Sequence, residues 1–229
     1  RIGMSPGAAL GALEFLSSCP EVAVGGIYTH FACAETNRQF TLLQLDRFKA
    51  VLAEAAARGW KTGLRHAANS AGALGHPSTR LDMVRPGLAA YGLMDGFEPV
   101  LTLKTKIVFI KTVRPGTPIG YGAAYRTKRR TRVATVPIGY ADGFPRGLSN
   151  KGEALVAGTR CPVAGVVSMD MTMLDVTRAK GCRVGDEVVL IGRSGGEEIS
   201  ARDVARKLGT IPYEVVCGIS ARVPRAVLP

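Results

Sequence analysis

Apolar and polar positions in the first ninety-odd residues follow a strand period and a helix period in turn. The strand-like runs are 22–31, 61–70 and 81–93, and the helical stretches between them are 41–59 and 71–75. In the longer helical stretch apolar side chains recur every three or four positions, and Gly59 is placed to end the helix. These side chains are Leu45, Phe48, Leu52 and Ala55. Strands that alternate with helices predict βαβ units and a parallel sheet.

From about Phe97 onward the pattern becomes one of short strand-like runs separated by turns. The runs are 100–113, 130–138, 153–158, 161–176 and 186–192. One helix interrupts them, beginning at Ser200 with Asp203 at the capping-box position and ending at Gly209. Ile199 and Val204 have the spacing of a hydrophobic staple. This part of the chain therefore predicts an all-β domain that carries one helix.

The two patterns predict an α/β domain over residues 1–95 and a β domain over residues 96–229. The α/β part holds only three or four strand–helix units, whereas a closed (β/α)₈ barrel of the TIM type needs eight units. If the fold is a barrel, these residues form its C-terminal half. The chain begins with arginine and not with methionine, and we expect an upstream segment to lie outside this sequence.

The formal net charge of the 229 residues is +12. Up to Asp95 there are 9 basic and 7 acidic residues, and beyond it 21 and 11, so the second domain carries +10 of the excess. The excess is densest where basic residues occupy every second position: Arg126, Lys128, Arg130 and Arg132. In a strand this spacing puts all four on one face, and a solvated sheet face is the simplest interpretation. A basic module that binds nucleic acid is the alternative, but neither aromatic interleaving nor zinc spacing supports it.

The five cysteines are single and widely spaced, which argues against a disulfide framework or a metal site and favours a reduced, cytoplasmic location. No apolar run approaches the roughly 20 residues that a membrane span needs. We expect neither a membrane nor a nucleic acid among the partners.

Polar residues follow the strand-like runs of the first domain. His30 ends the first run, His66 and Ser70 the second, and Arg85 precedes Gly87-Leu88 in the third. In a barrel the carboxyl ends of the strands build the active site, and glycine-containing loops at helix starts bind phosphate through backbone N–H groups. Each residue alone is weak evidence, because a serine before a helix is more often a plain N-cap and a lone histidine is usually structural.

In the second domain Tyr121 stands between two glycines, in the segment Ile119-Gly120-Tyr121-Gly122. Glycines on both sides allow a sharp backbone turn and a close approach to a neighbour. We interpret the segment as one that holds a tyrosine out for chemistry.

Eight blocks in one order are far more specific than any single residue. They read GIYTHFACAE, RHAANSAGAL, DMVRPGLAAYGL, IGYGAAY, VPIGYADGFPR, VAGVVSMDMTMLDV, GDEVVLIG and IPYEVVCGISARVPR. Through nearly its whole length the chain resembles alanine racemase, a pyridoxal-phosphate enzyme with an N-terminal (β/α)₈ barrel and a C-terminal β domain. The resemblance implies an isomerase that interconverts L- and D-alanine and supplies D-alanine for peptidoglycan.

Matching positions imply a role for each site residue. Tyr121 is the catalytic base on one face of the substrate α-carbon, His30 hydrogen-bonds it, and Arg85, oriented by His66, faces the cofactor ring nitrogen. The residues implied to hold the cofactor phosphate are Ser70, Gly87, Leu88 and Tyr213. The residues implied to contact substrate or line its entrance are Arg1 (which also contacts the cofactor), Tyr140, Met169 and Asp170.

These roles agree with the chemistry of racemisation, which needs one base to remove the α-proton and an acid on the opposite face to return one. A free phenol is a poor base at neutral pH, and a histidine–arginine pair is the cationic environment that improves it. An arginine does not readily give up a proton, so the ring nitrogen stays unprotonated, which favours proton exchange over decarboxylation or transamination.

The family's Schiff-base lysine has no counterpart here, because none of the lysines lies in a block of the required kind. We therefore expect residues 1–229 alone to be inactive. The resemblance also implies a homodimer with shared active sites. A racemase of serine, or of a broad set of amino acids, remains an alternative within the family.

Overall fold

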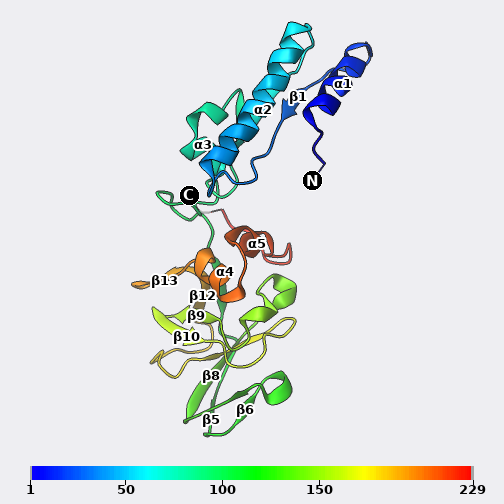
Figure 1. Ribbon diagram of the computed structural model, residues 1–229. Coiled ribbons are helices and arrows are strands. Elements are labelled where there is room, and N and C mark those ends of the chain that lie inside the picture. Colours follow the sequence, from blue (N-terminus) through cyan, green and yellow to red (C-terminus); the bar gives the residue numbers. More distant parts are fainter. Residues whose placement is uncertain (1, 228–229) are drawn as a thin grey trace. The chain divides into compact units, whose positions relative to one another are not determined.

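The structure is a computed structural model that describes residues 2–227. The chain folds into two compact units, unit 1 (residues 1–90) and unit 2 (residues 91–229) (Figure 1). The division lies a few residues before the boundary expected after residue 95. No helix in the described part of the chain has the length and apolar character needed to cross a membrane.

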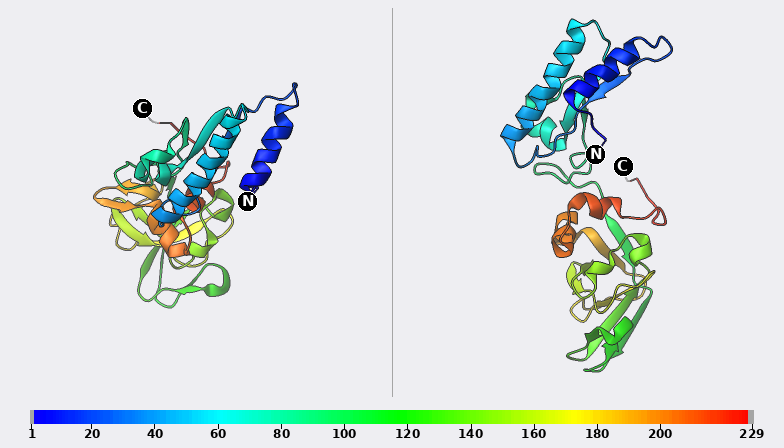
Figure 2. Two further views of the ribbon diagram at one scale, coloured as in Figure 1. Left: turned by 45° about the horizontal axis from the view of Figure 1, so that its top comes forward. Right: turned by 45° about the vertical axis from the view of Figure 1, so that its right-hand side comes forward.

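Unit 1 is a three-stranded parallel sheet with helices. Its elements are α1 (Pro6–Ser17), β1 (Gly26–Tyr28), α2 (Arg38–Ala57), β2 (Leu64–Asn69), α3 (Ser70–Gly75), the 3₁₀ turn η1 (Pro77–Thr79) and β3 (Met83–Arg85). The strand order is β1-β2-β3, and both pairings are parallel, as the alternating pattern predicted. Helix α1, which the sequence pattern did not reveal, packs against α2 (Figures 1 and 2).

The core of unit 1 lies under the apolar stripe of α2. Leu45 and Phe48 are buried together with Phe31 and Ala67, and Leu52 packs against them. The predicted helical spacing is therefore confirmed. Asn37 caps the start of the helix, and beyond its end Gly59 has φ +72°, the left-handed conformation that suits a residue just past a helix.

A bidentate ion pair joins β2 to the turn before β3. The Asp82 carboxylate accepts hydrogen bonds from Arg65 Nε and Nη2 and from the Arg65 backbone N–H, each at 2.8 Å. These hydrogen bonds lower the pKa of Asp82 to about 2.

This pair predicts a specific pH dependence of stability. A carboxyl with a depressed folded-state pKa contributes stability that is present above its unfolded value, near 3.9, and is lost as the pH falls toward 2. We therefore expect Asp82→Asn to lower the unfolding midpoint by a few degrees at pH 6 and to have only a small effect at pH 2, where half of the carboxyl is already protonated. The pair is open to solvent, so added salt should shrink the difference. Thermal unfolding of wild type and variant at both pH values measures the difference in midpoint. An equal decrease of the midpoint at pH 6 and pH 2 would contradict this account.

Unit 2 is built from antiparallel sheets. Its strands are β4 (Leu103–Lys106), β5 (Phe109–Val113), β6 (Pro118–Ile119), β7 (Tyr125–Arg126), β8 (Thr131–Val136), β9 (Glu153–Val156), β10 (Thr159–Pro162), β11 (Thr172–Asp175), β12 (Glu187–Ser194) and β13 (Glu197–Ile199). Strand β12 is central, because it pairs with β4, β9 and β13. A second sheet has the order β11-β8-β5, and β6 pairs with β7. The β character predicted for this part of the chain is confirmed.

The helices of unit 2 are α4 (Ala201–Leu208) and α5 (Pro212–Cys217), and its 3₁₀ turns are η2 (Tyr121–Ala123), η3 (Tyr140–Asp142) and η4 (Arg146–Leu148). The predicted capping box of α4 is present: Ser200 Oγ accepts from Asp203 N, and the Asp203 carboxylate accepts from Ser200 N. Gly209 ends the helix in the left-handed conformation. Helix α5 was not predicted.

The prediction that the alternating basic residues share one strand face is wrong. The pairing of β7 with β6 ends at Arg126, and β8 begins only at Thr131. Thr127 is buried between them, where its hydroxyl donates to Arg114 O at 2.6 Å and accepts from Thr117 N. This turn places Arg126 and Arg132 in different sheets, so the four basic side chains form no common face.

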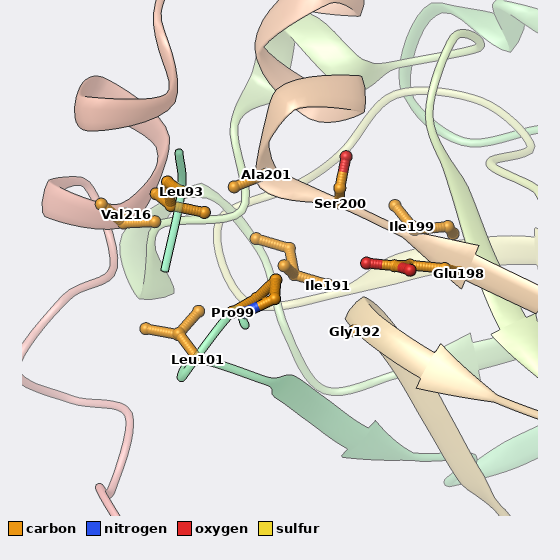
Figure 3. A pocket seen from close by; sticks show the side chains of 10 residues that line it. All are labelled: Leu93, Pro99, Leu101, Ile191, Gly192, Glu198, Ile199, Ser200, Ala201 and Val216. Carbon is orange, nitrogen blue, oxygen red and sulfur yellow. The ribbon is translucent and has the colours of Figure 1, made fainter. Parts of the chain in front are cut away.

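A small, almost entirely apolar pocket lies in unit 2 between the segment 93–101, β12 and the first residues of α4 (Figure 3). Leu93, Leu101, Ile191 and Val216 line it, and the carboxylate at its rim, that of Glu198, pairs with Arg193 at 2.9 Å. None of the site residues predicted from the sequence lines this pocket.

Candidate active site

Arg85 is the centre of a polar cluster at the carboxyl ends of the unit 1 strands. It is the last residue of β3, and its guanidinium donates to Thr29 O at 2.9 Å and to Ala67 O at 3.3 Å. The same Nη2 lies 3.4 Å from His30 Nδ1. The structure thus brings His30, His66 and Arg85, all three predicted from the sequence, into one cluster.

His66 accepts a hydrogen bond from Arg85. Arg85 Nη1 lies 2.5 Å from His66 Nδ1, and because a guanidinium can only donate, the imidazole hydrogen of a neutral His66 is on Nε2. Burial, together with the charge of Arg85, lowers the pKa of His66. A neutral imidazole with a fixed tautomer therefore holds one side of the guanidinium.

Tyr28 completes this cluster. Its ring stacks on the His66 imidazole with a centroid separation of 5.1 Å and an interplanar angle of 6°, and Arg85 Cζ lies 5.2 Å from the ring centroid. A cation over an aromatic face is attracted to the ring. Sequence reasoning did not single out Tyr28, although it lies two residues before His30 in a quoted block.

Ser70 connects two loops of the cluster. Its side chain is buried, and its Oγ accepts hydrogen bonds from Gly87 N at 2.8 Å and Ala89 N at 3.3 Å. The N-cap of α3 is instead Asn69, whose Oδ1 accepts from Gly72 N. The interpretation of Ser70 as a plain N-cap is therefore wrong, and Ser70 lies against the Gly87-Leu88 turn.

Tyr121 lies in unit 2 on the turn after β6, with its side chain 73% exposed. Gly120 and Gly122 have φ of +73° and +66°, which L side chains rarely adopt. A Cβ on Gly120 would lie 3.2 Å from both Val166 N and Met173 Cε, so the turn packs closely on the chain at that point. The sharp turn and close approach predicted from the glycines are confirmed.

Tyr140, Met169 and Asp170 are brought together by two loops of unit 2. Tyr140 N donates to Ser168 O and Ala141 N to Met169 O, each at 3.0 Å. A Cβ on Gly139 would lie only 2.2 Å from Ser168 O. The Tyr140 loop is therefore held directly against the loop that carries Met169 and Asp170.

Arg222 and Asp142 tie a third segment to these loops. Arg222 Nη2 lies 3.1 Å from Asp170 Oδ1, and its Nε lies 3.4 Å from Asp142 Oδ1. The Asp142 carboxylate also accepts from Gly139 N at 2.9 Å. Neither residue was predicted for the site, although the sequence signal was present, because both lie in the quoted blocks.

Tyr213 is half-buried in the first turn of α5. Arg1 lies outside the described residues.

Comparison with known proteins gives this geometry a context. The family model for the alanine racemase N-terminal domain matches residues 1–95, and that for the C-terminal domain matches residues 100–227. Alanine racemases of Symbiobacterium thermophilum and Halothermothrix orenii are 50% and 47% identical, each over 98% of this chain. The chain spans 62% of the length of each.

Solved structures of alanine racemases have the same fold as this chain. The alanine racemase of Bacillus anthracis with bound L-Ala-P is 39% identical, with a TM-score of 0.90 over 97% of this chain and 60% of that one. The biosynthetic alanine racemase of Pseudomonas aeruginosa is 36% identical, with a TM-score of 0.82 over 99% of this chain and 63% of that one. From its two matched domains, its relatives and its fold, the chain belongs to the alanine racemase family.

Proposed function

We propose that the protein containing this chain interconverts L- and D-alanine. The observation that carries the proposal is the Arg85 cluster, in which a guanidinium is fixed between His66, Thr29 and His30 at the strand ends of a chain of this family. A racemase of serine or of several amino acids would use the same cluster. The relatives named above favour alanine.

The residues of unit 1 fit pyridoxal phosphate. A phosphate needs hydrogen-bond donors. The buried Ser70 Oγ accepts from Gly87 N and Ala89 N, so its own O–H can donate to a phosphate. Of unit 1, Ser70, Gly87 and Leu88 would hold the phosphate, Arg85 would donate to the ring nitrogen, and Arg1 would contact the cofactor and the substrate carboxylate. The resemblance adds Tyr213, a residue of unit 2, to the phosphate ligands. When bound, the cofactor supplies the electron sink that makes the α-proton of the amino acid removable.

The chain's own residues would then move and guide the proton. Tyr121, held out on its two-glycine turn, takes the proton from one face of the substrate α-carbon, and His30 hydrogen-bonds the phenol oxygen. The second base, for the opposite face, lies outside this chain's site residues. Tyr140, Met169 and Asp170 line the entrance and exclude water from the reacting atoms.

The proposed assembly is a homodimer with shared sites, in which Tyr121 serves the partner's His30. Unit 1 would be the C-terminal half of a (β/α)₈ barrel whose other strands come from the segment that the longer relatives contain. We place the enzyme in the cytoplasm, since its five cysteines are unpaired. Its D-alanine would enter peptidoglycan.

Tyr121→Phe in the full-length protein tests the proposal. Racemisation should fall about 100-fold or more, the usual contribution of a positioned acid–base group. Exchange of the α-hydrogen with solvent deuterium should be lost for one enantiomer and persist for the other, because Tyr121 serves a single face. Tyr125→Phe, in the neighbouring strand β7, is the control and should leave the ratio of the two exchange rates unchanged. Small, equal losses for both enantiomers would show that Tyr121 is not the base.

A further inference from the structure

Helix α2 carries an amide side chain on the face that packs against the rest of unit 1. Gln44 is half-buried and shares that face with the buried Thr41, Leu45 and Phe48. An amide placed among apolar side chains is costly unless its polar atoms are hydrogen-bonded. The hydrogen-bond partners of the Gln44 amide therefore indicate why this position of α2 holds a glutamine.

Both ends of the Gln44 amide are used by one irregular segment, residues 29–32, which follows β1. Nε2 donates to Thr29 Oγ1 at 3.0 Å and to His30 O at 2.7 Å. Oε1 accepts from Ala32 N at 3.2 Å. Because His30 O needs a donor and Ala32 N needs an acceptor, a single orientation of the amide satisfies all three bonds.

The other side of the same segment faces Arg85. The guanidinium donates to Thr29 O and lies 3.4 Å from His30 Nδ1. Thr29 and His30 are thus held between a helix side chain and a strand-end side chain. Loss of either contact would change where the His30 imidazole lies.

We infer that Gln44 is a positioning residue, which fixes the backbone of residues 29–32 and through it the His30 imidazole beside Arg85. The inference rests on the proposed function, in which His30 hydrogen-bonds the catalytic phenol. Gln44 itself lies behind the segment and acts only through it.

The experiment compares Gln44→Met with wild type in the full-length enzyme, with Gln39→Met as the matched control on the exposed side of α2. Methionine keeps the length and loses all three hydrogen bonds. Hydrogen–deuterium exchange at Ala32 N–H should become on the order of tenfold faster. The kcat should fall roughly ten- to hundredfold with KM within about threefold, because a small misplacement of a catalytic group is costly. Gln39→Met should match wild type in both readouts.

Gln44→Glu separates positioning from folding. A carboxylate still accepts from Ala32 N but cannot donate to His30 O, so exchange at Ala32 should stay slow while kcat falls as in Gln44→Met. If Gln44→Met does not fold, the kcat and the Ala32 exchange rate of Gln44→Glu test the inference. Wild-type kcat in Gln44→Glu, or unchanged exchange in a folded Gln44→Met, would overturn the inference.

The experiments distinguish a failure of the proposed function from a failure of the inference about Gln44. If wild type does not racemise alanine, or Tyr121→Phe is fully active, that function is wrong. The positioning of residues 29–32 by Gln44 is then judged by the exchange rates alone.

Discussion

Arg85→Lys in the full-length protein is expected to lower racemisation about 100-fold while keeping the positive charge. The guanidinium serves His66 Nδ1, Thr29 O and Ala67 O with a fixed, planar set of donors. A lysine offers a single nitrogen and cannot reach all three of these acceptors at once. Partly buried acceptors left without a donor should also lower the free energy of unfolding, by about 1 kcal/mol.

Steady-state kinetics and urea unfolding measure the two effects, and Arg80→Lys is the control. Arg80 lies in the same unit and donates to one carbonyl, Ala73 O, at 2.8 Å. That variant should change neither quantity appreciably. An Arg85→Lys enzyme within about threefold of wild type would show that geometry at this guanidinium does not limit the reaction.

Gly139→Ala is expected to lower the free energy of unfolding by about 3 kcal/mol, from overpacking and from strained hydrogen bonds. The new Cβ would lie 2.2 Å from Ser168 O and 2.4 Å from Met169 O, and these are backbone atoms that cannot rotate away. The loops must separate, which breaks the bonds from Tyr140 N and Ala141 N.

Gly196→Ala is the matched control, because a Cβ there meets nothing within 4 Å and the backbone needs no positive φ. Urea unfolding of the two variants should differ clearly, and Gly139→Ala should also raise KM through displacement of Tyr140 and Met169. Equal midpoints would mean that the two loops can move apart at no cost.

Much of the fold could be predicted because local physics determined it. The spacing of Leu45 and Phe48 determines which face of α2 is buried, and Ser200 with Asp203 determines where α4 begins. The two glycines around Tyr121 required the turn that the structure contains. The site residues were found from their resemblance to a family. The structure brings His30, His66 and Arg85 together and holds the Tyr140 loop against that of Met169 and Asp170, but it does not test their roles.

The errors have a common physical cause, which is that distant partners decide local conformation. The run 100–113 divides into β4 and β5 because the first pairs with β12 and the second with β8. The basic alternation failed because the Thr127 hydroxyl closes a turn on Arg114 and Thr117. Gln44 could not be identified from spacing, since its partners lie 12 to 15 residues away in a loop without periodicity.

The pairing of β4 with β12 has a consequence for synthesis on the ribosome. Strand β4 ends at Lys106 and its partner begins at Glu187, so about 80 residues separate them, and at roughly 5–20 residues per second β4 waits some 4–16 s for that partner. During this time its edge is open to wrong pairings. Lys104 and Lys106 carry charge along that edge, which discourages such pairings. Once β12 has been synthesised, Lys104 forms an ion pair with Glu187 at 3.1 Å. The charge that discourages wrong pairings of the nascent strand therefore also favours the native pairing with β12.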